Sequence, residues 1–267
     1  MAVIRRLFIF FCFLSIFVGL FISYQVYAYY CKPIVLVEDV RFRIEPGSSL
    51  RKILKELSSH QDIKPFSKKW YEIFIRMHAN TTKIKAGEYI LKKNMTGSEL
   101  ISQLIKGKVV LHSLTLIEGW TFKDCIKAIH KHPAIKKTFD TDDYTQIREK
   151  LIITESSIEG FFFPETYYFP YGTTDRDFLL RAHQLMQKKL QLAWHARSPN
   201  LAIDSPYEAL ILASILEKES ALVAEWPIIS QVFHNRLKIK MRLQADPTVI
   251  YGLGANFAGR LNKDALK

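Results

Sequence analysis

The chain has 267 residues, of which 48% are hydrophobic, and its Lys and Arg residues exceed Asp and Glu by enough to give a formal net charge of +12. This length and apolar content are sufficient for one or two domains with a sizeable buried core. The three cysteines exclude a disulfide framework, because Cys12 falls in an apolar N-terminal stretch and leaves only Cys31 and Cys125 to pair. The charge indicates affinity for a polyanion, although a solvated basic surface explains it equally well.

The stretch from Leu7 to Tyr30 predicts a membrane-spanning helix. It contains 24 residues without a formal charge, and as a helix it would measure about 36 Å, enough to cross a hydrocarbon layer of ~30 Å. Arg5 and Arg6 precede it, so the positive-inside rule places the N-terminus in the cytoplasm and the chain from Lys32 onward outside. An exported chain meets a membrane surface or an anionic wall polymer, so we expect no nucleic-acid partner.

A cleaved signal peptide is the alternative to a retained anchor. Val26-Tyr27-Ala28 fits a small-residue cleavage pattern loosely, but the apolar core is longer than a signal peptide needs. A lipoprotein is excluded, because Tyr29 and Tyr30 are bulky where a lipid-attachment motif before Cys31 needs small residues. Cys31 could still pair with Cys125, although free thiols, with Cys125 buried as a small apolar side chain, are favoured.

Residues 32–110 alternate predicted strands and helices, which is typical of a small α+β module. In order we expect a strand over Val35–Ile44, a helix capped by Ser48 or Ser49, a helix over Lys68–His78, a strand after a turn near Ile84–Leu91, and a helix from Thr96 to Gly107.

A second region opens with a strand and turn over Val109–Gly119 and a helix capped by Thr121. An aromatic run follows, in which seven of the eleven residues from Phe161 to Tyr171 are aromatic. Such side chains can stack on sugar rings in a glycan groove, or they can pack as an ordinary buried strand. A long amphipathic helix over Thr173–Trp194 then provides scaffold.

The stretch from Ser205 to Glu219 predicts a helix with an N-cap, a proline in its first turn and a glutamate placed to close a capping box. From Ala209 to Leu216 only Ser214 is polar, so we expect this helix to be buried nearly all round. A carboxyl group at the end of a buried helix would keep its proton near neutral pH and could act as a general acid. The alternative is that Glu217 and Glu219 are ordinary solvated side chains.

Trp226-Pro227 begins a second helix, which predicts a helical hairpin. Its apolar stripe is expected to include Ile228, Val232 and Phe233. Beyond it, Asp246-Pro247 predicts a polar turn followed by a short β-branched run. No metal site and no cofactor are expected, because the eight histidines form no zinc-binding array and no phosphate-binding or dinucleotide loop is present.

Three segments in one order and spacing resemble a known family. They are Ala213-Ser214-Ile215-Leu216-Glu217-Lys218-Glu219, Val232-Phe233-His234-Asn235-Arg236-Leu237 and Leu243-Gln244-Ala245-Asp246-Pro247-Thr248-Val249-Ile250-Tyr251-Gly252. Together they resemble the endolytic murein (peptidoglycan) transglycosylases of the bacterial inner membrane, the YceG-like family. The Glu159-Gly160-Phe161-Phe162-Phe163-Pro164 run is similar to that family too, and the region around Lys85-Ala86-Gly87-Glu88-Tyr89 resembles its LysM-like module.

The resemblance implies an α+β protein with three parts. Residues 1–31 would form a cytoplasmic tip and transmembrane helix, residues 32–110 a LysM-like module, and residues 111–267 a mixed α+β catalytic domain. The chain would lie mostly outside the inner (cytoplasmic) membrane and bind peptidoglycan glycan strands, with peptidoglycan synthases as further partners.

The resemblance also implies a lytic transglycosylase that cuts MurNAc-GlcNAc β-1,4 bonds within nascent strands and leaves 1,6-anhydroMurNAc ends, which terminates glycan elongation. A reaction of this type needs one acid/base rather than the two carboxylates of a hydrolase. The implied catalytic residue is Glu219. The implied substrate-binding residues are Glu165, Tyr167, Asn235, Gln244 and Asp246.

The sequence departs from the family at its C-terminal end. It stops at Lys267 without the Tyr-Asn-Thr-Tyr-like and proline-rich stretches that family members carry, so the catalytic domain is expected to be incomplete. The alternatives are a catalytically impaired, membrane-anchored protein that binds peptidoglycan and a scaffold for other wall-synthesis proteins.

Overall fold

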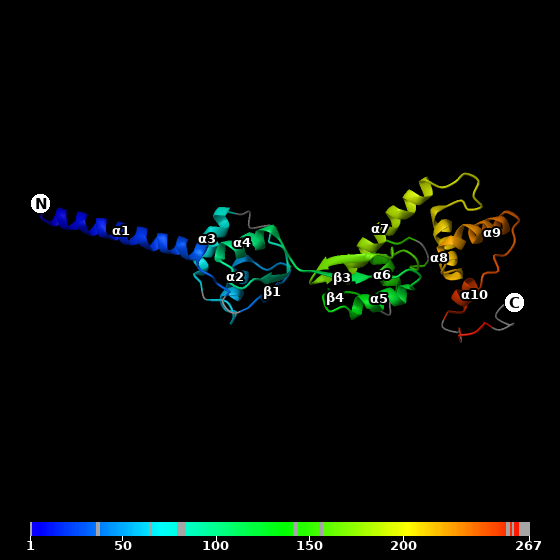
Figure 1. The fold of residues 1–267 in the computed structure, drawn as a ribbon, viewed down its shortest axis with the longest axis horizontal. Coiled ribbons are helices and arrows are strands. Elements are labelled where there is room, and N and C mark those ends of the chain that lie inside the picture. Colours follow the sequence, from blue (N-terminus) through cyan, green and yellow to red (C-terminus); the bar gives the residue numbers. More distant parts are fainter. Residues whose placement is uncertain are drawn as a thin grey trace. The chain divides into compact units, whose positions relative to one another are not determined.

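The computed structural model describes residues 2–35, 38–64, 66–78, 84–140, 144–154, 157–254, 257 and 259–261. It is a mixed α+β protein of two compact units (Figure 1). The first unit comprises residues 1–112 and 168–172, and the second comprises residues 113–167 and 173–267.

The first unit begins with α1 (Ala2–Cys31), which is apolar on every side. Its stretch Ile4–Cys31 has a mean hydropathy of 2.5 and none of its most apolar window is buried against other parts of the protein. Among the described residues it is the one helix long and apolar enough to cross a membrane. Its surface matches the expected anchor in length and composition.

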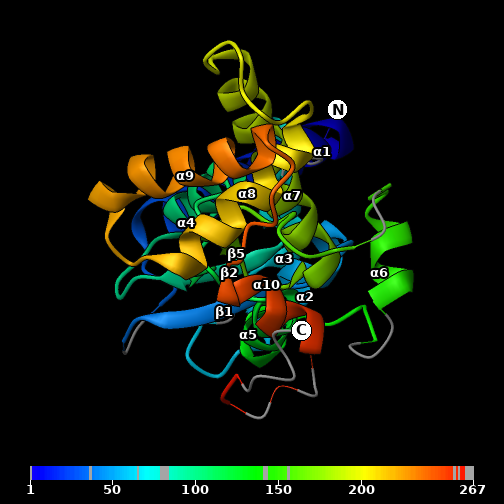
Figure 2. The same cartoon turned by 90° about the vertical axis from the view of Figure 1, so that its right-hand side faces the viewer.

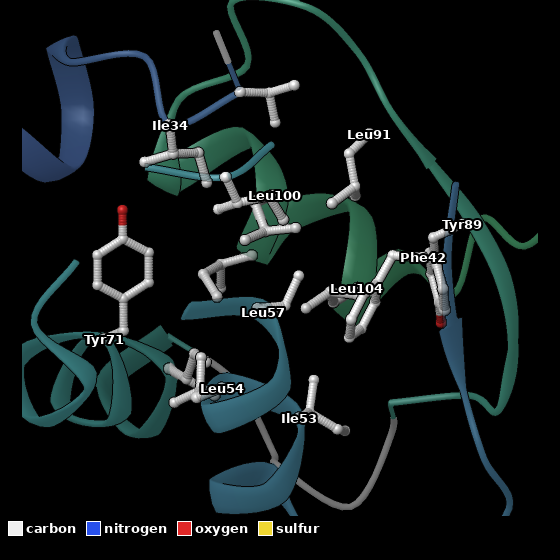
Figure 3. Packing of buried hydrophobic residues seen from close by; sticks show 14 of the residues in the cluster. Ile34, Phe42, Ile53, Leu54, Leu57, Tyr71, Tyr89, Leu91, Leu100 and Leu104 are labelled. Atoms are coloured by element: carbon white, nitrogen blue, oxygen red, sulfur yellow. The ribbon is translucent and has the colours of Figure 1, made fainter. Parts of the chain in front are cut away.

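The rest of the first unit is a small α+β module. Strand β1 (Val40–Ile44) pairs antiparallel with β2 (Gly87–Leu91). Helices α2 (Leu50–Ser58), α3 (Lys68–His78) and α4 (Gly97–Lys106) surround one apolar core. Figure 3 shows side chains from these helices and both strands pointing toward a common centre. The labelled core residues are Ile34, Phe42, Ile53, Leu54, Leu57, Tyr71, Tyr89, Leu91, Leu100 and Leu104.

Local capping signals in this module form as the sequence predicts. The Ser49 hydroxyl caps α2 by accepting the backbone N–H of Lys52. Thr96 and Glu99 form a capping box at α4, and Gly107 ends that helix with a left-handed φ of 60°. The first strand is shorter than predicted and comprises only Val40–Ile44. Leu36 and Val37, which the prediction included, lie outside the described residues.

Residues 168–172 belong to the first unit although the residues on either side of them belong to the second. The guanidinium of Arg43 lies 4.4 Å above the ring of Tyr171. Gly87 lies close to Pro170 as well, since a Cβ built on it would be 3.5 Å from the Pro170 side chain and 2.9 Å from that of Val109. This short segment is therefore packed against β1 and β2.

Two further two-stranded pairs, β3–β5 and β4–β6, join strands that are far apart in the sequence, and parts of β3 and β5 count with the first unit. Strand β3 is Leu111–Thr115 and β5 is Thr166–Pro170; the short strands β4 (Ile135–Lys136) and β6 (Thr173–Thr174) pair in parallel. Helices α5 (Phe122–Lys131), α6 (Tyr144–Lys150) and α7 (Asp175–His195) complete this part. Thr121 caps α5 as expected, with Asp124 closing a capping box.

A buried carboxylate fixes the start of α7. Asp175 is fully buried and accepts the backbone N–H and the hydroxyl of Thr138, the backbone N–H of Phe139 and the ring N–H of His130 at 2.8 Å. Burial by itself would raise the pKa of Asp175, but the hydrogen bonds from Thr138, Phe139 and His130 outweigh it and lower the pKa.

The cysteines take no part in disulfides. Cys12, Cys31 and Cys125 are all free thiols, and Cys125 is buried, as the sequence favoured. Burial, and next the negative charge of Glu159, raise the pKa of Cys125 to about 12, so this thiol is held in its protonated form.

The chain then forms α8 (Pro206–Glu219), the short 3-10 helix η2 (Val223–Glu225), α9 (Trp226–Lys238) and α10 (Asp246–Leu253). Figure 2 shows α8 and α9 side by side. Their small shared core consists of Leu212, Ile215, Phe233 and Ala245.

Two expectations for this part were wrong. The segment after Asp246-Pro247 is the helix α10 rather than a turn and a β-branched run, because Pro247 occupies the first helical turn, where its missing N–H costs nothing. Helix α8 is not buried nearly all round. Only Leu212 and Ile215 are buried, while Ile211 is 43% exposed, because the described neighbours of α8 cover one side of the helix.

Candidate active site

The candidate site lies at the C-terminal end of α8, where the chain changes from apolar to charged residues. The helix begins as predicted, with the Ser205 hydroxyl accepting the N–H of Glu208 and Pro206 in the first turn. It ends at Glu219, whose side chain is exposed. The desolvation that the sequence predicted at this carboxyl group is therefore absent, because the helix leaves one side open to water.

The last turn of α8 rests on a glycine turn. Gly119 has a φ of +72°, and a Cβ built on it would lie 3.3 Å from Lys218 Nζ and 3.6 Å from Glu217 Cγ. A side chain at this position would press on the residues immediately before Glu219. Gly160, with a φ of +79°, faces Leu210 earlier in the same helix. Gly119 thus allows a close approach to the end of α8, whereas a Cβ at Gly160 would lie 3.8 Å from Leu210 in ordinary contact, so only its left-handed φ favours glycine there.

The chain immediately after Glu219 is held by a compact hydrogen-bonded turn. The Ser220 hydroxyl donates to Glu225 Oε2 at 2.6 Å and accepts the backbone N–H of Leu222 at 3.0 Å. The indole N–H of Trp226 donates to the Ser220 carbonyl at 2.9 Å. These bonds close the hairpin between α8 and α9, and they fix the backbone on the C-terminal side of Glu219.

The loop between α9 and α10 is fixed by similar means. The guanidinium of Arg236 donates to the Leu243 carbonyl, and the Met241 N–H donates to the Arg236 carbonyl at 2.8 Å. Gln244 has a left-handed φ of 52°, and the next residue, Ala245, is buried in the core shared with α8. The loop thereby holds Gln244 and Asp246 on either side of a buried anchor.

Four of the predicted site residues come from this one packed group of helices. Glu219 ends α8, Asn235 lies in α9, Gln244 precedes α10 and Asp246 begins it, and all four side chains are exposed. Asn235 accepts a hydrogen bond from Gln231 at 2.9 Å. The fold brings together the elements that carry these residues.

The other two predicted residues lie at the β5 strand. Tyr167 is buried, its ring packs against Phe178 and its hydroxyl donates to the Phe163 carbonyl at 2.6 Å. Burial raises the pKa of Tyr167 to about 12. Glu165 is exposed and accepts the N–H of Thr166. These contacts favour a packing role for Tyr167.

The aromatic run around them divides into two groups. Phe161, Phe162 and Phe169 are buried, whereas Tyr168 is 60% exposed. Phe161 stacks on Tyr207 in the first turn of α8, with ring centroids 5.7 Å apart. Four of the seven aromatic residues, including Tyr167, are therefore buried core, as the alternative of ordinary packing predicted, and Phe161 supports α8.

Glu159 is a candidate that the sequence reasoning missed. Its carboxylate is half-buried and accepts the backbone N–H of Phe122, the first residue of α5, at 2.7 Å. Burial raises the pKa of Glu159, and the nearby Asp124 adds to the shift, while the Phe122 N–H opposes it. Glu159 precedes Gly160, so one residue ties the start of α5 to the turn that faces α8. The sequence signal available was its place at the start of the aromatic run.

A family comparison identifies the group to which this arrangement belongs. The sequence profile of the YceG-like family matches residues 42–267. The chain belongs to the YceG-like family. An endolytic murein transglycosylase of Streptococcus pneumoniae (strain R6) is 30% identical over 210 residues, covering 68% of this chain and 38% of that protein. The endolytic murein transglycosylase of Bacillus subtilis (strain 168) is 28% identical over 242 residues, covering 84% of this chain and 66% of that protein.

The chain therefore spans between 38% and 66% of the length of these YceG-like relatives. A crystal structure of a YceG-like protein from Listeria monocytogenes superposes on 86% of this chain and 80% of its own, with a TM-score of 0.45 and 22% sequence identity.

Proposed function

We propose that this YceG-like chain is a lytic transglycosylase that cleaves MurNAc-GlcNAc β-1,4 bonds within nascent peptidoglycan strands. The relatives named endolytic murein transglycosylase support the activity. The observation that carries it is the exposed Glu219 at the end of α8, a helix that packs with the elements carrying Asn235, Gln244 and Asp246.

In the proposed reaction Glu219 is both the acid and the base. Its protonated carboxyl group donates a proton to the glycosidic oxygen, and the bond to C1 of the muramic sugar breaks with an oxocarbenium-like transition state. The carboxylate then accepts the proton of the C6 hydroxyl as O6 bonds to C1. Glu219 therefore gives up one proton and later takes one back. The product carries a 1,6-anhydroMurNAc end, and no water molecule acts as a nucleophile.

Because Glu219 is exposed in the free chain, we propose that the bound substrate shields it from water. A glycan strand lying across the end of α8 would displace water from the carboxyl group, which favours its protonated form and prepares it to act as an acid. Asn235, Gln244, Asp246 and Glu165 are proposed to orient the strand or to stabilise the developing positive charge. Tyr167 would act by packing the strand that carries Glu165.

We further propose the setting of this reaction. Helix α1 would anchor the chain in the bacterial inner membrane as a single pass, with the two units outside. The small module of the first unit would be a LysM-like glycan-binding domain, and peptidoglycan synthases would be partners because they produce the nascent strand.

The test is mass spectrometry of purified peptidoglycan incubated with the detergent-solubilised full chain. We expect 1,6-anhydromuramyl products from the wild type and a loss of about 10²-fold or more with Glu219→Gln, which keeps the shape of the side chain and removes the proton. Glu217→Gln is the matched control, since it lies two residues earlier on the same helix, and it should retain activity.

Three outcomes have distinct meanings. Products lost only in Glu219→Gln would establish the proposed acid/base. Products lost only in Glu217→Gln would transfer the role to that residue. A folded wild type that binds glycan strands and yields no anhydro products would refute the enzyme in favour of a binding protein.

A further inference from the structure

Helix α3 of the small module lies across the C-terminal end of α1 (Figure 1). The ring of Phe74 stacks on Tyr29 with centroids 4.2 Å apart, and Tyr71 meets the same ring edge-on at 5.4 Å. Nearer the middle of α1, Trp70 lies 6.2 Å from Phe21. Aromatic contacts therefore hold α3 against the last third of the apolar helix.

Helix α3 has a second apolar face that the module does not cover. Its core face consists of Tyr71, Phe74 and Ile75, which are buried. Three further residues, spaced three and then four positions apart on one side of the helix, form what we call the lipid-facing stripe. These are Trp70, which is partly buried, Ile73, which is 44% exposed, and Met77, which is 73% exposed.

The remaining side of α3 is charged. Glu72 binds Arg76 in the same helix at 2.6 Å and Arg51 of α2 at 3.3 Å, while Lys68 and Lys69 are exposed. A helix with a wide apolar arc, a Trp at its edge and a basic polar face is typical of segments that lie in a membrane interface.

The length of α1 that fits within a bilayer determines where the lipid-facing stripe lies relative to the membrane surface. Ile4–Cys31 has 28 residues and measures about 42 Å, whereas a hydrocarbon layer of ~30 Å takes about 20 residues. Counting from Leu7, which follows the charged Arg5 and Arg6, the outer hydrocarbon boundary falls near Val26. Phe21 then lies about 7 Å inside the hydrocarbon. Because Trp70 packs against Phe21, α3 reaches the outer surface of the membrane.

The residues around this boundary match the chemistry of lipid headgroups. Tyr24, Tyr27 and Tyr30 are each about half exposed, and such aromatic side chains concentrate at membrane–water interfaces. Lys32 Nζ donates to the Tyr24 hydroxyl at 2.8 Å. Lys32 and Lys64 both line a cavity of about 340 Å³ between α1 and the start of α3. Two ammonium groups at this depth are placed to bind lipid phosphates.

We propose that α3 is an interfacial helix, and that the lipid-facing stripe of Trp70, Ile73 and Met77 lies in the headgroup–acyl boundary of a phospholipid bilayer. Lys32 and Lys64 bind phosphates of the same leaflet. This inference rests on the proposed anchoring by α1 and adds a second membrane contact to it. Its consequence is that the small module rests on the bilayer and does not extend freely from the anchor.

The experiment uses the full chain in vesicles of phosphatidylcholine and phosphatidylglycerol that carry bromine atoms on their acyl chains near the headgroup. Bromine quenches a tryptophan only at short range, and the difference between the wild type and Trp70→Phe isolates the emission of Trp70 from that of the other three tryptophans. We expect bromination to reduce the Trp70 emission by about two-fold or more if its ring lies in the interface. The difference between the wild type and Trp194→Phe gives the emission of Trp194, a tryptophan of the second unit. Bromination should leave that emission unchanged.

A double variant tests the stripe itself. Ile73→Glu with Met77→Glu places two charges at exposed positions, so the fold should tolerate them, but they oppose insertion. The Trp70 emission of this variant should then be the same in brominated and in unbrominated vesicles. Ile228→Glu in α9 is the matched control, because Ile228 is 69% exposed and lies in the second unit; it should leave the quenching unchanged.

Co-flotation of the chain with the vesicles after alkaline washing separates the two proposals. A chain that floats but shows no quenching of Trp70, or keeps its quenching in the double variant, would overturn the interfacial helix and leave the anchor standing. A chain that does not float would overturn the anchor, and the interfacial helix with it.

Discussion

Gly119 gives the sharpest test of how the end of α8 is positioned. Its φ of +72° is a conformation that costs an Ala residue about 1–2 kcal/mol. For a unit of this size, that cost lowers the melting temperature by about 2–8 °C. The Cβ of Gly119→Ala would also lie 3.3 Å from Lys218 Nζ, so the Lys218 side chain, which directly precedes Glu219, must move by a few tenths of an ångström.

That shift predicts a loss of activity beyond the loss of stability. Since a misplacement of ~1 Å in an active site can cost about 10²-fold, a displacement a few times smaller should lower the rate of anhydro-product formation by about 3–10-fold. The assay is product release from peptidoglycan by Gly119→Ala at a temperature well below its melting point, with thermal unfolding followed in parallel.

Two variants separate the contact from the backbone strain. Gly47 has a similar φ of +78° and no atom within 4 Å of a built Cβ, so Gly47→Ala should lose stability and keep full turnover. Gly119→Asn should regain part of the stability, because Asn tolerates the left-handed region, and should still show reduced turnover. Equal turnover in Gly119→Ala and Gly47→Ala would refute the idea that this turn positions Glu219.

Three further predictions follow from contacts of single residues. Asp175→Asn should destabilise the second unit by about 3–5 kcal/mol in denaturant unfolding, because the N–H and hydroxyl donors around it lose a buried charged acceptor. Since the pKa of Asp175 is lowered by folding, its contribution is present above the unfolded pKa of about 4 and is lost as the pH falls further, so the variant should show a weaker acid dependence than the wild type. Trp226→Phe should reduce turnover by several-fold with little change in KM, as measured by initial rates, because it removes the indole bond to Ser220 beside Glu219. Thr96→Ala should cost about 1 kcal/mol in unfolding, because it removes the capping box of α4.

The features that the sequence predicted well are those set by neighbouring residues. A cap such as Ser49 or Thr121 bonds an N–H three residues away, so the signal and the structure lie within one turn. The same holds for the start of α8 at Ser205 and for α9 at Trp226-Pro227. The sequence signals that start and end a helix also set the lengths of these helices.

The features that the sequence missed depend on distant partners. How much of α8 is buried depends on which helices cover it, and a run of apolar residues does not specify this. Glu159 is half-buried because it meets Phe122, which lies 37 residues earlier. The left-handed Gln244 and the helix at Asp246 follow from Ala245 being held in the core beside α8. Such contacts arise only in the folded chain.

The assignment of residues 168–172 to the first unit affects how this protein can be dissected. The backbone passes from one unit to the other after His112, after Tyr167 and again after Gly172. A fragment that starts at Ser113 would carry the Tyr168–Gly172 segment without Arg43, whose guanidinium covers Tyr171. After a single proteolytic cut near residue 112, we expect the two products to stay associated through that segment. Truncation experiments should therefore compare fragments with and without it before any lost activity is attributed to the small module.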